Sequence, residues 1–278
     1  GLSDSYVSIT DDFASIAKSI GGDHVHVETL VKGSRNMHHI NPKPSMVMKV
    51  KRADMIIRIG MATDSWIDSL IEVARNQRVF VGENGHINAS LRISKLEVPT
   101  QSVDGSMGDV HIEGNPHYWL NPMNGILIAE QIRDHLIKLD PKNSNTYTKN
   151  ARQFRSNIES KMPQWKSKLT GIKHAPFITY HAVWPYFFDA FELNNIAKIE
   201  PFPGIPPTAK HLNTVNELAK SSSPKPIFVT ANFYPKRIAD QIAADVGAKS
   251  YHIPSNVGEF GIQSYSELFD FIIKEITN

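Results

Sequence analysis

Three histidines stand in short loops whose composition suits metal binding, because neutral imidazole nitrogen is a common ligand of transition metals in proteins. His117 lies in residues 114–122 (GNPHYWLNP), and an apolar segment follows at once, so Pro122 occupies a tolerated first-turn position of a predicted helix. That arrangement places an imidazole on a rigid loop. His38 and His181 lie in two other loops of similar character. Three imidazoles from three separate loops could therefore converge on one metal ion.

The composition limits which other side chains could take part. The 278 residues include no cysteine, so any transition-metal site must be built from histidine, aspartate and glutamate. Lysine and arginine number 30 against 28 acidic residues, a net charge of +2, which gives no electrostatic reason to expect nucleic acid. We therefore expect a divalent metal ion, and no nucleic acid, as a partner.

The chain shows no hydrophobic segment of the kind that crosses or enters a membrane. No apolar run approaches the roughly twenty residues that a membrane span requires. No signal-like segment precedes Gly1. We expect that the chain is a processed or truncated form from which a targeting signal has been removed.

The first half of the chain alternates strand and helix patterns. The expected strands are 6–9, 24–31, 55–60 and 78–81, and the expected helices are 12–20, 45–53, 64–75 and 124–139. Such alternation favours parallel sheets with right-handed crossovers. Between residues 82 and 115 the pattern gives way to Gly, Asn, Ser and Asp, broken only by a possible strand at 96–98. This segment predicts a long surface loop.

A long helix is expected to separate this series from a second one. The helical pattern runs from 141 to about 169 and is rich in polar residues, and a helix of that length spans roughly 40 Å. The strands expected after it are 176–179, 196–199, 227–230 and 249–253, and the helices are 184–191, 208–221, 235–246 and 264–276. The sequence therefore predicts two α/β lobes with parallel sheets, at 1–140 and 172–278, with a connecting helix at 141–171.

The chain resembles the zinc and manganese group of metal-binding solute-binding proteins of bacterial ABC importers. In that family a first ligand histidine lies in Asp-Pro-His-x-Tyr-Glu-Pro-x-Pro-Ser, and residues 36–45 (NMHHINPKPS) keep the histidine, as His38, and both later prolines. A second lies in Asp-Pro-His-x-Trp-Leu-Asp-Pro, the most specific motif, which residues 115–122 match with His117. A third opens His-x-x-(aromatic)-x-Tyr-Phe, which residues 181–187 match with His181.

The resemblance implies a structure and a function. The family has two α/β lobes joined by a long rigid helix, with the metal in the cleft between them. Members tuned to manganese tend to carry a carboxylate at the third position, so His181 favours Zn²⁺, and residues 200–207 (EPFPGIPP) look like a segment of one zinc-associated branch. Mn²⁺ or Fe²⁺ are the alternatives. We expect a monomeric periplasmic or cell-surface protein that hands its ion to a membrane ABC permease.

The fourth ligand departs from the family pattern. Much of the family has an aspartate after the last strand, whereas residues 252–259 (HIPSNVGE) contain none. Glu259 lies in the same loop and is expected to be the fourth ligand, with water or His252 as the next candidates. A water there would give the open His₃ geometry of catalytic zinc, and Glu200 is the best candidate for the base of a zinc-dependent hydrolase. The chain lacks His-Glu-x-x-His, and we expect no enzymatic activity.

The other histidines are expected to be solvated or to make ordinary hydrogen bonds; they are His24, His26, His86, His135, His174 and His211. His39 and His111 are candidates for contacts around the site rather than for ligands, and simple surface exposure is the favoured interpretation of both. Residues 104–113, which precede the second motif, are acidic but not rich in histidine, so an ion-gathering role for them stays open.

The proposed ligands also predict how metal binding depends on pH. Because bound imidazole must be unprotonated, metal affinity should decrease as the pH drops below the ordinary histidine pKa of about 6.5.

Overall fold

The computed structural model describes residues 5–32, 40–108 and 110–278. Its contacts divide the chain into two compact units. The first unit holds residues 1–94, 122–161 and 256–267, and the second unit holds residues 95–121, 162–255 and 268–278. The loop that carries His117 thus belongs to the second unit, together with His181. The boundaries expected from the sequence, at 140 and 171, stay a prediction.

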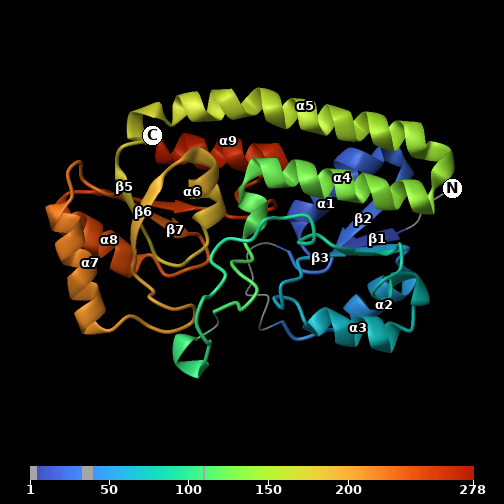
Figure 1. Ribbon diagram of the computed structural model, residues 1–278, viewed down its shortest axis with the longest axis horizontal. Helices are drawn as coiled ribbons and strands as arrows, with labels where there is room; N and C mark the ends of the chain where they lie inside the picture. The colour runs from blue at the N-terminus through green and yellow to red at the C-terminus, as the bar shows by residue number, and fades with distance from the viewer. Residues whose placement is uncertain (1–4, 33–39, 109) are drawn as a thin grey trace. The chain divides into compact units, whose positions relative to one another are not determined.

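The sheet of the first unit is parallel and has the strand order β2-β1-β3-β4. Its strands are β1 (Ser5–Ser8), β2 (His26–Thr29), β3 (Met55–Arg58) and β4 (His86–Asn88). Helices α1 (Asp11–Gly21) and α4 (Pro122–Leu139) pack together, as do α2 (Pro44–Arg52) and α3 (Trp66–Ala74), and Figure 1 shows the two pairs on opposite sides of the sheet. All four residues of β3 are buried, which is typical of a strand covered on both faces.

The second unit repeats this arrangement with the strand order β6-β5-β7-β8. Its parallel strands are β5 (Pro176–Thr179), β6 (Asn194–Lys198), β7 (Ile227–Ala231) and β8 (Lys249–Ile253). The helices of this part of the chain are α6 (Pro185–Phe191), α7 (Ala209–Ser221), α8 (Arg237–Val246) and α9 (Tyr265–Ile276). Because the chain moves from β5 to β6 on one side and then returns to β7 on the other, the strand order reverses between β5 and β7. Ligands of open α/β sheets collect at the carboxyl ends of the strands at such a point.

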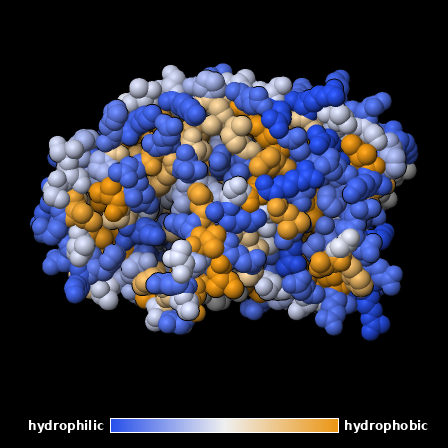
Figure 2. All heavy atoms as spheres, in the orientation of Figure 1, coloured by the Kyte–Doolittle hydropathy of each residue, from blue (hydrophilic) through white to orange (hydrophobic). Residues whose placement is uncertain are grey.

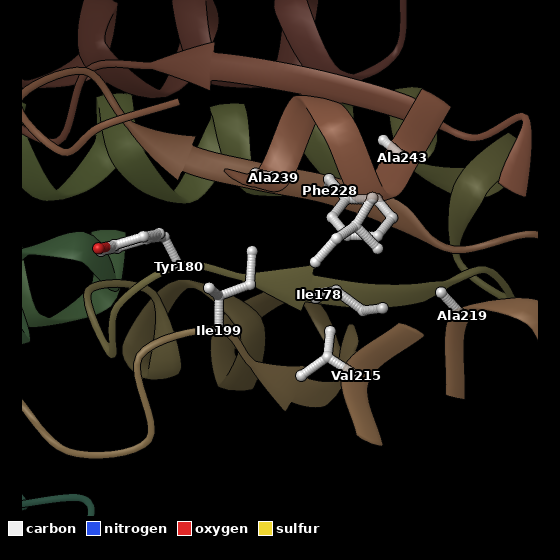
Figure 3. Close-up of a cluster of buried hydrophobic side chains, with 9 residues drawn as sticks. Ile178, Tyr180, Ile199, Val215, Ala219, Phe228, Ala239 and Ala243 are labelled. Carbon is white, nitrogen blue, oxygen red and sulfur yellow. The ribbon is translucent and has the colours of Figure 1, made fainter. Parts of the chain in front are cut away.

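One hydrophobic cluster fixes β5 and β7 of the second unit side by side (Figure 3). Ile178 of β5 and Phe228 of β7 are fully buried and pair in register. Val215 of α7 and Ala239 of α8 belong to the same cluster. Burial of apolar surface stabilises the folded state by about 25 cal/mol per Å². These contacts therefore hold β5 and β7 in place beside each other.

The long helix predicted between the two series is confirmed as α5 (Ser144–Lys168). At 1.5 Å per residue its 25 residues extend about 37 Å. Most of its side chains are polar, and its few buried apolar residues anchor it. In the second unit, Trp165 donates from Nε1 to Asp270 Oδ1 at 2.8 Å and packs on Phe269. The predicted fold class, parallel α/β with a long helix, is confirmed.

Most predicted elements agree with the structure to within a few residues, but the strand predicted at 78–81 is wrong. Gln77–Val79 form a 3₁₀ turn, because the Asn76 side chain accepts a hydrogen bond from the backbone of Arg78 and caps the turn. The fourth strand of this sheet is β4, inside the segment predicted as loop. Three residues are too few to show the alternation that identifies a strand.

The possible strand at 96–98 is also absent. The backbone N–H of Leu96 donates to the Tyr186 hydroxyl rather than to a neighbouring strand. Glu97 adopts a left-handed conformation with φ of 58°, which breaks an extended strand.

Among the described residues, none of the helices is long and apolar enough to span a membrane. The face drawn in Figure 2 is largely hydrophilic, with apolar residues in small groups.

The core of the second unit gives a test of the fold. We expect Phe228→Ala to lower the free energy of unfolding by about 3–5 kcal/mol, because it removes a fully buried ring and leaves a cavity. Urea unfolding followed by circular dichroism measures this change. Leu218→Ala, at an exposed position of α7, is the control and should change stability by about 0.5 kcal/mol or less. A loss for Phe228→Ala no larger than that of the control would contradict this packing.

Candidate metal centre

His181 stands at the carboxyl end of β5, and the pairing of the parallel strands brings Glu200 beside it. The pairing of β5 with β6 continues past both strands, because Ile199 N donates to Thr179 O and Glu200 N donates to Tyr180 O, each at 2.8 Å. This register sets Glu200 next to His181, and His181 Nδ1 is hydrogen-bonded to Glu200 Oε1.

The Glu200 contact fixes the tautomer of His181. An ionised carboxylate can only accept a hydrogen bond, so Nδ1 of the neutral ring carries the proton and the lone pair lies on Nε2. The side chains of His181 and Glu200 are only 11% and 7% exposed. Carboxylates that bind the second ring nitrogen in this way orient metal-binding histidines and raise their basicity.

Tyr234 packs on the face of the His181 ring. It follows β7, where its backbone N–H donates to Ala231 O at 3.0 Å. The two rings stack with centroids 4.7 Å apart and planes 27° apart. His181, Glu200 and Tyr234 therefore come from the carboxyl ends of β5, β6 and β7, where parallel strands position ligand-binding residues.

His117 is held by a tight turn and an aromatic anchor. Its backbone N–H donates to Asn115 Oδ1 at 2.9 Å, a local side-chain turn of the kind that asparagine favours. The neighbouring Trp119 is buried and donates from Nε1 to Ser255 O at 2.8 Å. The Trp119 ring packs edge-on to the His117 ring at 5.5 Å. A short 3₁₀ turn (Tyr118–Leu120) then leads into α4, with Pro122 as its first residue, as the sequence predicts.

Burial keeps the His117 ring uncharged. Its pKa is well below 6.5, first because the ring is removed from water and then because His181 and His111 would repel a charge on it. Its Nδ1 atom is buried and has no hydrogen-bond partner among the described residues. A buried nitrogen without a partner is costly unless a ligand satisfies it, and a neutral imidazole is the form that binds metals.

The two rings face one cavity of about 360 Å³ in the second unit. Their centroids are 6.0 Å apart and their planes are almost perpendicular, at 88°. Two imidazoles on one tetrahedral Zn²⁺, with Zn–N of about 2.0–2.1 Å, place their ring centres about 5 Å apart. The observed separation of the two ring centres is about 1 Å larger than this. Glu97, His111, Lys198 and Phe202 line other parts of the same cavity.

The structure thus brings together two of the four predicted ligands. Within residues 5–32, 40–108 and 110–278 there is no group of three or more His, Asp or Glu side chains placed to hold a metal. His38 lies outside the described residues, as does His39. Glu259 is half-buried in the first unit, and its assignment as the fourth ligand stays a prediction. His252, the alternative, lies in β8, and it is not among the residues that line this cavity.

Most of the histidines that were expected to play no part in the site have local partners. His86, His135 and His211 bond to backbone carbonyls, His26 lies near Glu28, and His24 packs edge-on to Tyr147. His174 is exposed. His111, for which simple surface exposure was the favoured expectation, is half-buried and lines the cavity that His117 and His181 share.

Sequence reasoning identified Glu200 only as a possible catalytic base and missed its bond to His181. The sequence did contain part of the information needed to predict this bond. Residues that directly follow neighbouring parallel strands share one edge of the sheet, and Glu200 follows an expected strand. The stacking of Tyr234 had no sequence signal, because nothing in the chain shows that β7 lies beside β5.

Comparison with known proteins now identifies the family. The model of the family described as "Zinc-uptake complex component A periplasmic" (ZnuA) matches residues 7–278. The chain therefore belongs to this family. It is 25% identical over 234 residues to the zinc-binding lipoprotein AdcA of Streptococcus pneumoniae strain R6, covering 84% of this chain and 46% of AdcA. It is 23% identical over 271 residues to the iron-binding protein YfeA of Yersinia pestis, covering 94% of this chain and 81% of YfeA. The chain spans about half the length of AdcA.

Solved structures share the fold. A crystal structure of ZnuA superimposes with a TM-score of 0.81 at 22% identity, covering 99% of this chain and 98% of that one. The manganese-bound periplasmic metal-binding protein of Candidatus Liberibacter asiaticus superimposes with a TM-score of 0.78 at 19% identity, covering 99% and 98%. At these identities the likeness establishes the architecture, and the choice of metal needs a separate argument.

The uncharged state of His117 predicts how stability depends on pH. Burial lowers the pKa of folded His117 below the unfolded value of about 6.5, so the unfolded state takes up this proton first. The contribution of His117 to metal-free stability is therefore complete above pH 6.5 and is lost as the pH falls towards the folded pKa. We expect urea unfolding between pH 8 and 5 to show a smaller decrease in His117→Gln than in the original protein. His174→Gln, at an exposed position, is the control, and an equal decrease in all three proteins would contradict the neutral ring.

Proposed function

We propose that this protein is an extracytoplasmic zinc-binding protein that delivers its ion to a membrane ABC permease. The observation that carries the proposal is the His117–His181 pair, with ring centroids 6.0 Å apart in one cavity. Each ring has a property that favours metal binding. Burial holds His117 neutral, and Glu200 leaves the Nε2 lone pair of His181 available.

The proposed ligands are His38, His117, His181 and Glu259. Three imidazole nitrogens and one carboxylate oxygen form the four-coordinate shell that Zn²⁺ prefers. The carboxylate cancels one of the two positive charges and so lowers the cost of holding the ion away from water. That the ion lies between two lobes also stays a prediction.

Zinc is the proposed ion because the donor set is rich in nitrogen. Imidazole suits borderline ions such as Zn²⁺, whereas Mn²⁺ prefers carboxylates, carbonyls and water. Zinc, iron and manganese all occur among the relatives and structural neighbours described above. Mn²⁺ and Fe²⁺ are therefore the ions to compete against zinc in binding experiments.

The proposed protein performs no covalent chemistry. A zinc hydrolase would need a general base free to activate the metal-bound water. Glu200, the candidate base, is buried and hydrogen-bonded to His181 Nδ1, which suits orientation of the ligand rather than proton transfer to water. A hydrolysis screen with the zinc-loaded protein separates the two functions, and zinc-dependent turnover abolished by Glu200→Gln would favour the enzyme.

Delivery requires that the ion leave. Small displacements of the loops that carry the ligands would break the shell, and docking on a permease could supply the free energy for that displacement. We propose that the protein acts as a monomer in the periplasm or at the cell surface.

The ligand assignment predicts the binding properties of two variants. We expect the metal-free protein to bind one Zn²⁺ tightly in a competition titration with a chromogenic chelator. His117→Ala and His181→Ala should each weaken binding by at least about 100-fold, since each removes one of the few bonds to the ion. His174→Ala, on the exposed surface of the same unit, should bind as the original protein does. Stoichiometric tight zinc in His117→Ala would show that the central ligand is misassigned.

Glu200 gives a second test, because it touches a proposed ligand without binding the ion itself. We expect Glu200→Gln to weaken zinc binding by about 10–100-fold, the usual effect of losing a partner that orients a metal-binding histidine. Glu192→Gln, at an exposed position in the same unit, is the matched control. Equal affinities for Glu200→Gln and the control would contradict the orienting role.

A further inference from the structure

Asn115 joins the two loops that carry His117 and His181. Its Oδ1 accepts from the backbone N–H of His117 at 2.9 Å. Its Nδ2 donates to the carbonyl of Ala182, the residue after His181, at 2.6 Å. One buried side chain therefore bonds directly to the backbone on both sides of the candidate metal centre.

The side-chain amide of Asn115 also bonds to a third segment of the chain, the one that carries Glu97. Asn115 Nδ2 also donates to Glu97 Oε1 at 2.9 Å. Glu97 lines the same cavity as the two histidines, and its backbone is left-handed at φ of 58°, a strained conformation for glutamate that persists only when its surroundings hold it. Both amide hydrogens of Asn115 thus have partners, and both partners are acceptors.

The backbone around Asn115 is fixed by a second set of contacts. Asn115 N donates to Leu96 O at 2.7 Å, while the buried Tyr186 hydroxyl donates to Asn115 O at 2.6 Å and accepts from Leu96 N at 3.0 Å. At Gly114, a side-chain carbon would lie 2.9 Å from Leu96 O, and φ is 113°, so only glycine fits. These contacts fix the backbone from which the Asn115 side chain extends.

An amide is required at this position, and a carboxylate would not serve. The family motif described above has aspartate where this chain has Asn115. An ionised aspartate could still accept from His117 N, but it has no hydrogen to donate to Ala182 O or to Glu97. It would place a carboxylate within hydrogen-bond distance of the exposed Glu97 carboxylate, and two like charges at that distance repel each other.

We infer that Asn115 is a positioning residue that fixes the distance between His117 and His181 before any metal binds, and that Glu97 is its matched partner. This inference rests on the proposed function for its biological meaning. The fixed distance between the two rings is a property of the metal-free protein and can be tested without zinc. The Asn115–Glu97 pair makes the His117–His181 pair a pre-formed half of the site rather than one that the ion must assemble.

The test is a double-mutant cycle with two readouts. The four proteins are the original chain, Asn115→Asp, Glu97→Gln and the double variant, with Asn213→Asp on the exposed face of α7 as a control for the same chemical change. The first readout is the NMR positions of the His117 and His181 ring C–H signals in the metal-free proteins. The second is zinc affinity by chelator competition.

We expect a specific pattern across the cycle. Glu97→Gln should resemble the original protein, because the glutamine carbonyl still accepts from Asn115. Asn115→Asp should shift both ring signals and weaken zinc binding by about 10–100-fold. The double variant should recover part of both properties, because the glutamine amide can donate to the new carboxylate at position 115, while Ala182 O still lacks its donor. Asn213→Asp should change neither readout.

Two outcomes would overturn the inference. Unchanged ring signals in Asn115→Asp would show that the amide does not position the histidines, and a double variant no better than Asn115→Asp would show that Glu97 is not its partner. If Asn115→Asp does not fold, Asn115→Ala replaces it, with the same loss expected and no recovery on adding Glu97→Gln. If the original protein binds no zinc, the proposed function fails, while the metal-free NMR cycle still decides the positioning role.

Discussion

The parallel pairing of β5 with β6 and β7 is the constraint on which the candidate metal centre depends. It sets three chain segments side by side at one edge of a sheet, and each supplies one group: His181, Glu200 and Tyr234. The hydrophobic cluster beneath fixes the strands, so the imidazole is oriented by rigid structure rather than by a flexible loop. A ring held on one edge by a carboxylate and on one face by an aromatic ring loses little conformational entropy when it binds an ion.

His117 reaches the same cavity by a different route. Its loop precedes the long helix α5 in the chain but belongs to the second unit, where Asn115 and Trp119 hold it. The surroundings of the two histidines differ in kind. A carboxylate orients His181, whereas burial and the nearby His181 and His111 keep His117 neutral. Burial favours the unprotonated form of His117 that a divalent cation needs, and the Glu200 contact leaves the Nε2 lone pair of His181 available.

Much of this architecture could be predicted from the sequence, because hydrophobic periodicity reports on local structure. Strand β5 was predicted with its observed bounds, and α5 to within a few residues. Strand β4 could not be predicted, since its three residues form a strand only because β3 lies beside them. His117 and His181 were proposed as ligands because each stands in a recognisable motif. The bonds of Asn115 were invisible, since its partners lie 18 and 67 residues away and only the folded chain brings them together.

The central claim is that His117 and His181 bind the same ion. Anomalous scattering at the zinc absorption edge, from crystals of the zinc-loaded protein, tests it most directly, because it gives the identity and the position of the ion together. The account predicts one zinc peak at about 2.0–2.1 Å from a ring nitrogen of each histidine. A zinc peak beyond bonding distance of either ring would contradict it.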